Sequence, residues 1–284
     1  MQSTKDDGVR HITNTQVVLL SEFIEDELGI SHERFKLLLK LGAIYVNSYR
    51  ATKDKWLFET TTLRVHTQPR RFPSDHPWRA LIVFENDTFL ILNKPAGLPS
   101  HPSVDNTLED AMTQTGLAIK TPLYITHRLD TLTSGLIVYA KRKSFVKDFN
   151  MQLIARTIQK KYVALVSPVV DIQKRLVHYM DPAPGTPKKL STEHQEGWDE
   201  CVLEVMEQKR LSPKTLWIKI NLLTGRTHQI RAQLAKIGAP IIGDTKYGSD
   251  TPYRPNAIAL KSCEIEFDFE GRRLRFNLPD ALEF

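Results

Sequence analysis

A polar loop that leads directly into an apolar strand presents a carboxylate at residue 130. Residues 127–133 read His-Arg-Leu-Asp-Thr-Leu-Thr, and a short apolar run from Leu136 to Ala140 follows Gly135. Such a run is typical of a buried strand, whereas Asp, Thr and Ser favour turns because their side chains bond to the nearby backbone. Asp130 is therefore expected to be held rigidly where chemistry is possible. The alternative is that Asp130 only stabilises its own turn.

Two further side chains are candidates to meet this carboxylate. Tyr162 lies in an apolar strand-like segment, where its phenol could contact a planar ring or move a proton; the alternative is a core or edge aromatic. Arg226 follows Gly225 before a helical pattern. A guanidinium there is able to bind Asp130 through both carboxylate oxygens and to lower its pKa. The alternative is a surface salt bridge, which contributes only 0 to about 1 kcal/mol.

The charge of the chain favours a polyanionic partner. The net charge is +6 and the isoelectric point is about 9.2, a balance often found in proteins that bind nucleic acids. When Lys and Arg are counted against Asp and Glu, residues 1–14 and residues 15–66 are each neutral. The excess of positive charge therefore lies in residues 67–80 and 81–284.

Other sequence features argue against several classes of protein. No run of 18 apolar residues and no signal-like start are present, so we expect a cytoplasmic protein without a membrane segment. Cys201 and Cys263 are the two cysteines, and neither belongs to a Cys-x-x-Cys pair. The histidines also lack metal-binding spacing, so we expect neither a disulfide framework nor a bound metal.

Patterning divides the chain into a tail at 1–14, a small domain at 15–66, a linker at 67–80 and a large domain at 81–284. In the small domain, Gly29 and Gly42 are placed to end two helices, and Ser31 is placed to begin the second. Short strands should follow. The linker contains three prolines and three arginines, which predicts a stiff basic connection. Many short strands with few helices predict an α+β fold with a mixed, mainly antiparallel sheet in the large domain.

Four segments of the large domain resemble, in order, motifs of the RluA-type pseudouridine synthases, which modify RNA. Residues 127–136 resemble the central motif, and residues 224–231 resemble the arginine motif almost letter for letter. The other two segments are residues 93–102 and 160–165. The small domain, with Ser31, Gly42, Val46 and Asn47 in register, resembles the S4 domain of RNA-binding proteins. It departs from that pattern in its neutral charge and in Ser48, where Gly is usual.

The resemblance implies a pseudouridine synthase fold and the isomerisation of uridine to pseudouridine in structured RNA, such as an rRNA or tRNA stem-loop. It also implies that Asp130 is the catalytic carboxylate and that Tyr162 and Arg226 complete the catalytic set. The reaction breaks the bond between C1′ and N1, rotates the uracil and joins C1′ to C5. It requires a carboxylate and proton movement, but no cofactor and no metal.

Substrate contacts follow from the same resemblance. A uridine in a stem must be flipped out of the helix, and His127 or Arg128 is expected to fill the vacated space. Leu260 is expected to contact the uracil ring. Lys261 stands where similar proteins usually have His. We expect the protein to act on RNA as a monomer.

Two other classes of function are compatible with the residues. A non-catalytic RNA-binding protein would not need Asp130, Tyr162 and Arg226 together. A glycosidic-bond hydrolase would need a second acid near Asp130, and Asp244 is the candidate within a motif. Tritium release from labelled uridine separates the three classes.

Overall fold

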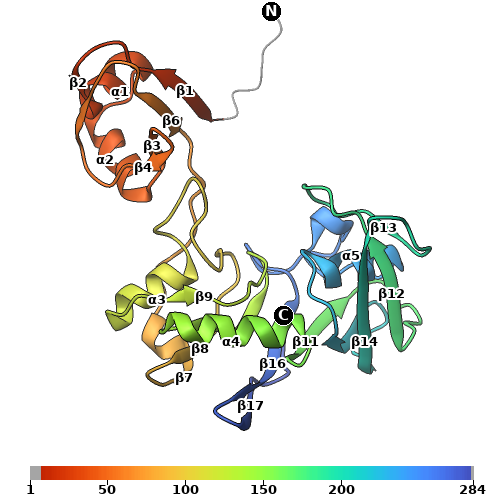
Figure 1. Cartoon of the computed structure of the whole chain (residues 1–284). Helices are drawn as coiled ribbons and strands as arrows, with labels where there is room; N and C mark the ends of the chain where they lie inside the picture. Colours follow the sequence, from red (N-terminus) through yellow and green to blue (C-terminus); the bar gives the residue numbers. More distant parts are fainter. Residues whose placement is uncertain (1–7, 283–284) are drawn as a thin grey trace, which may run out of the picture.

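The computed structural model describes residues 8–282, and its N-terminal part combines two helices with a small antiparallel sheet (Figure 1). The sheet has the order β1-β6-β3-β4, while β2 pairs with β5. Leu20, Phe35 and Val65 belong to the core that joins the helices to the sheet. The elements are β1 (Val9–Thr13), β2 (Val18–Leu19), α1 (Leu20–Leu28), α2 (His32–Leu41), β3 (Ile44–Val46), β4 (Tyr49–Arg50), β5 (Trp56–Leu57) and β6 (Thr62–His66).

The predicted helix ends of this part are confirmed. The Ser31 side chain accepts a hydrogen bond from the backbone N–H of Arg34 at the start of α2. Gly29 and Gly42 adopt the left-handed conformation after α1 and α2, which glycine tolerates because it lacks a Cβ. Asn47 and Ser48 both have positive φ between β3 and β4. Ser48 therefore occupies a turn position that favours glycine.

Two sequence expectations for the flanks of this part differ from the structure. Val9–Thr13, which lies within the predicted tail, forms an edge strand paired with β6; residues 1–7 of that tail lie outside the described residues. The linker is also bound to the large domain, although the sequence predicted only a stiff connection between the two domains. Arg70 and Arg71 pair with Asp105 and Glu109 of the large domain. Both differences arise from long-range pairing, which apolar periodicity does not report.

The ion pairs of the linker lower the pKa values of the two acids that they contain. Burial on its own would raise the pKa of Asp105, but hydrogen bonds from Arg70 lower it overall. The same balance, with Arg71 as the donor, lowers the pKa of Glu109. The loop that carries both acids also contacts the small domain, where the Thr107 N–H donates to Leu41 O at 2.8 Å. These contacts fasten the N-terminal part to the large domain.

The large domain is built on an 11-stranded sheet among the described residues, with the order β13-β12-β14-β15-β11-β16-β10-β8-β7; β17 pairs with β16 and β9 with β10. Only the β10–β16 pair of this sheet is parallel, so the mixed, mainly antiparallel sheet is confirmed. The strands are β7 (Ile82–Glu85), β8 (Phe89–Lys94), β9 (Tyr124–Ile125), β10 (Ser134–Ala140), β11 (Gln159–Val166), β12 (Arg175–Met180), β13 (Leu190–Ser191), β14 (Asp199–Arg210), β15 (Leu216–Leu222), β16 (Leu260–Phe269) and β17 (Arg272–Asn277).

Helices cover the two faces of the central strands. Phe145 and Phe149 of α4 pack on one face with Phe89 and Val138, while Ile230 of α5 belongs to the core of the other face. Successive strand residues alternate between these cores, as a pleated sheet requires. The helical segments are η1 (Trp78–Leu81), α3 (Ala111–Ile119), α4 (Lys143–Ile154), α5 (Gln229–Lys236) and η2 (Thr245–Tyr247). None of the helices described is both long and apolar enough to cross a membrane.

The parallel pairing of β10 with β16 requires a glycine at the start of β10. Gly135 has φ +107°, and a Cβ added to it would lie 2.1 Å from the backbone oxygen of Ser262. Neither atom is able to move far, since both belong to the central sheet. Gly135 thus allows the strand that follows Asp130 to approach β16.

Replacing Gly135 with Ala is expected to unfold the large domain or to lower its melting temperature sharply. Gly185 is a matched control, because it has φ +109° but no atom near an added Cβ. Gly185→Ala should cost only the backbone strain, about 1–3 kcal/mol, whereas Gly135→Ala adds the clash. Thermal unfolding of both variants measures the difference, and equal melting temperatures would contradict the explanation.

Candidate active site

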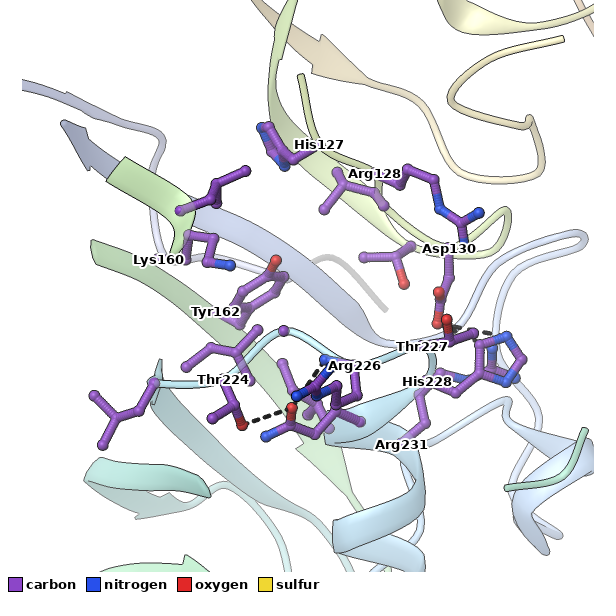
Figure 2. Close-up of a pocket in the computed structure, with 18 of the residues that line it drawn as sticks. His127, Arg128, Asp130, Lys160, Tyr162, Thr224, Arg226, Thr227, His228 and Arg231 are labelled. Atoms are coloured by element: carbon purple, nitrogen blue, oxygen red, sulfur yellow. Dashed lines mark hydrogen bonds and ion pairs between the residues drawn. The ribbon is translucent and has the colours of Figure 1, made fainter. Parts of the chain in front are cut away.

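A pocket of about 580 Å³ opens between the loop before β10, the end of α4, the start of β11 and the loop that enters α5 (Figure 2). This volume is in the range of pockets that hold small ligands. Asp130, Tyr162, Arg226, His127, Arg128 and Leu260 all line it. The fold therefore brings together residues from four segments that are distant in the sequence. Among its lining residues, Asp130 alone carries a carboxylate.

The Asp130 loop is braced by the irregular segment 93–102. Lys94 is completely buried, and its ammonium donates to the carbonyl oxygens of Pro95 and Leu98, each at 2.8 Å, and to that of Thr131 at 3.4 Å. The Gly97 N–H donates to the same Thr131 oxygen. These bonds fix the backbone next to the carboxylate, in agreement with the expected rigid turn.

Arg231, rather than Arg226, pairs with the carboxylate of Asp130. Its Nη1 lies 3.1 Å from Asp130 Oδ2, and its Nε and Nη2 bind the two oxygens of Asp244 at 2.6 and 2.9 Å. The side chains of Arg231 and Asp244 are 4% and 0% exposed, and that of Asp130 is 20% exposed. Arg231 and Asp244 are thus closed to solvent, whereas the partly exposed carboxylate of Asp130 is within reach of a ligand. Arg231 is the last residue of the arginine motif, so the motif contained a second arginine that could have been predicted to pair with Asp130.

The expected pair between Arg226 and Asp130 is wrong, because Arg226 precedes α5 and extends toward β14. Its Nη2 lies 2.9 Å from Asp199 Oδ1. The Gln229 side chain holds this loop by accepting from the Arg226 N–H and from the Thr224 hydroxyl. Arg226 still lines the pocket, so its side chain is placed to meet a substrate.

His228 and Tyr247 form a second contact beside Asp130 that sequence reasoning missed. His228 has φ +58° just before α5, a strained conformation that often occurs at functional sites. Its Nε2 lies 3.8 Å from Asp130 Oδ2, and its Nδ1 lies 3.1 Å from Tyr247 Oη. Burial lowers the pKa of His228, which favours the neutral ring. Asp130 therefore faces one buried cation and one neutral imidazole.

Tyr162 and Leu260 form an apolar wall of the pocket. They come from the neighbouring strands β11 and β16, and their side chains are 6% and 3% exposed. Burial raises the pKa of Tyr162, so its hydroxyl is protonated at neutral pH. Figure 2 shows Tyr162 on one side of the pocket and Asp130 on the other. A planar base between them would contact the Tyr162 ring and lie near the carboxylate.

His127 and Arg128 differ in their freedom to move. His127 Nε2 accepts from the Val138 N–H at 3.0 Å, and its ring stacks on Phe149. Burial, with the nearby Lys160 charge, lowers the pKa of His127 to about 3, so its ring is neutral. Arg128 is exposed and has no polar partner among residues 8–282. Of the two, Arg128 is the residue free to enter a space left by a flipped base.

Lys261 points away from the pocket. Its ammonium donates to the carbonyl oxygens of Pro279 and Ala281, so it holds the C-terminal segment against β16. Metal binding has no candidate cluster either: within residues 8–282, no group of three or more His, Cys, Asp or Glu side chains is arranged to hold an ion.

Comparisons with known proteins give the family. The model of the RNA pseudouridylate synthase family matches residues 88–236. Ribosomal large subunit pseudouridine synthase C of Buchnera aphidicola is 36% identical over 216 residues, which cover 72% of this chain and 67% of that protein. The chain therefore belongs to the RNA pseudouridylate synthase family.

Two further similarities define how far the likeness extends. RNA pseudouridine synthase 6, chloroplastic, of rice is 35% identical over 225 residues, which cover 70% of this chain and 47% of that protein. The chain thus spans about half the length of this plant relative. The solved structure of human RNA pseudouridylate synthase domain containing 1 has a TM-score of 0.56 and 23% identity, and covers 70% of this chain and 82% of that one. It supports the fold of the large domain.

Proposed function

We propose that this protein converts specific uridines in structured RNA to pseudouridine, without a cofactor, with Asp130 as the catalytic carboxylate. The observation that carries the proposal is the single lining carboxylate, Asp130, held by a buried arginine at the edge of a pocket in a chain of this family. An ionised carboxylate is suited either to attack C1′ or to promote elimination of the base. Ribosomal RNA is the first substrate to test, because the Buchnera relative is named for it, with tRNA second.

Tritium release tests this proposal directly. RNA labelled with tritium at C5 of uridine loses the label to water only when C5 forms the new bond to the sugar. A hydrolase would instead release free uracil. A protein that only binds RNA would release neither tritium nor uracil. The hydrolase alternative is further weakened by Asp244, whose oxygens both bind Arg231 and whose side chain is fully buried. Asp244 is thus not available to activate water.

The Tyr162 hydroxyl is proposed to take part in proton movement, and its removal tests this role. Tyr162→Phe keeps the ring and should lower turnover by about 10²- to 10⁴-fold, while thermal stability and RNA affinity stay close to those of the wild type. Tyr179→Phe, on β12, is the matched control because Tyr179 does not line the pocket. Full activity of the Tyr162 variant would limit this residue to packing.

The N-terminal domain is proposed to be an S4-like module that adds modest electrostatic affinity for RNA. Lys36 and Lys40 are exposed on α2 and have no polar partner among residues 8–282. In contrast, Arg70 and Arg71 of the basic linker already pair with carboxylates.

Replacing Lys36 and Lys40 together with Ala should therefore weaken RNA binding and reduce its salt dependence. Each lost phosphate contact reduces the magnitude of the slope of log affinity against log salt by roughly 0.7 to 0.9. Loss of both lysines should therefore reduce that slope by about one to two. Salt titrations of binding measure it. Glu25 and Glu27, exposed on α1, supply the control, since their replacement by Ala should not reduce the slope. An unchanged slope in the lysine variant would exclude this contact.

A further inference from the structure

Lys160 places a cation in the pocket that has no part in the roles proposed above for Asp130 and Tyr162. It belongs to β11 and lines the pocket two residues before Tyr162, on the same face of the strand. Figure 2 shows the side chains of both residues directed into the pocket, across from Asp130. Its ammonium makes no hydrogen bond and no ion pair with any residue in the range 8–282. Lys161, the next residue, instead pairs with Glu264 at 2.6 Å.

The surroundings of Lys160 leave its charge uncompensated. Burial lowers the pKa of its ammonium, and the nearby His127 ring is neutral. The backbone of Gly225 makes room for the ammonium, because a Cβ added there would lie 3.0 Å from Lys160 Nζ. A desolvated cation without a partner is unfavourable. A ligand that supplies a negative charge would remove that cost.

The proposed reaction generates such a charge inside this pocket. When the bond between C1′ and N1 breaks, both bonding electrons remain with the uracil, so the ring carries a negative charge shared by N1, O2 and O4. The ring then turns, C5 forms the bond to C1′, H5 leaves C5 and N1 gains a proton. No atom is gained or lost overall. The transition state of the first step is therefore more negative at the ring than the bound substrate is.

We propose that the Lys160 ammonium donates a hydrogen bond to a uracil oxygen and stabilises the detached uracil as an anion. This role rests on the pseudouridine synthase activity proposed above. Lys160 keeps its proton throughout, and its positive charge acts on the leaving ring from the Tyr162 side of the pocket, while Asp130 acts from the other. A positioned donor that meets charge only as it develops accelerates a reaction without tightening substrate binding.

Lys160→Met tests the role because it keeps the length of the side chain and removes the charge. With wild-type RNA at saturation, the single-turnover rate should fall by about 10²- to 10³-fold, while the dissociation constant for RNA changes by less than about threefold. The melting temperature should stay equal or rise, because an unpaired and partly desolvated charge is removed. Lys160→Arg should recover most of the rate. Lys147→Met, exposed on α4 and outside the pocket, should behave like the wild type.

Three results would overturn the inference. A Lys160→Met variant with the wild-type rate would show that the charge is not used. A weaker affinity with a smaller salt slope and an unchanged rate would assign Lys160 to a phosphate of the RNA. Lower melting temperatures of both the Met and Arg variants would assign it to the fold. If the wild-type chain formed no pseudouridine, the proposed function itself would fail, and this role with it.

Discussion

Asp130→Asn is expected to abolish pseudouridine formation while the protein remains folded and binds RNA. The amide has nearly the same shape as the carboxylate but lacks its charge and nucleophilicity, so a loss of at least about 10⁴-fold in single-turnover rate is expected. The stability effect should be small, about 1 kcal/mol, because Arg231 retains both of its bonds to Asp244.

Rapid-quench measurement of tritium release, together with thermal unfolding and RNA binding, checks this result. Asp148→Asn is a suitable control, since Asp148 is an exposed carboxylate of α4 outside the pocket. A variant of Asp130 that still formed pseudouridine at a measurable fraction of the wild-type rate would remove the residue from the chemistry. Loss of folding in that variant would instead make Asp130 structural.

Arg231→Lys is expected to have the second large effect, and it should damage both stability and activity. One guanidinium binds both oxygens of Asp244 through Nε and Nη2 and reaches Asp130 through Nη1. An ammonium lacks this planar fork, so it is unable to serve both acids. With Arg231 and Asp244 almost completely buried, the loss of stability should be about 3 kcal/mol, and Asp130 should lose its fixed orientation.

Arg226→Lys separates the two arginines. The pair between Arg226 and Asp199 is about 40% exposed on both sides, at 44% and 37%, so its contribution to stability should be below about 1 kcal/mol. Arg226→Lys should therefore melt close to the wild type, and any loss of turnover would report on substrate contact. If Arg231→Lys kept the wild-type melting temperature and rate, the buried network would not be what holds Asp130.

Features that depend on neighbouring residues were predictable from the sequence. The ends of α1 and α2 follow from Gly29, Ser31 and Gly42, whose conformations are local preferences. The rigid turn at Asp130 and the buried strand behind Gly135 are local in the same sense. The mainly antiparallel sheet followed from many short apolar segments. Motif resemblance indicated the pseudouridine synthase family, because motif residues are short contiguous strings.

Which charged side chains meet depends on contacts that form when the chain folds. Arg226 and Arg231 are five residues apart in one motif, and the sequence favoured the wrong one as the partner of Asp130. The choice depends on where α5 begins, which directs Arg231 inward and leaves Arg226 on the preceding loop. In the same way, Lys160 and Lys161 are adjacent, yet strand alternation pairs Lys161 with Glu264 and turns Lys160 into the pocket. Arg231 meets Asp130 across 101 residues of sequence and Lys161 meets Glu264 across 103, and no local pattern contains such contacts.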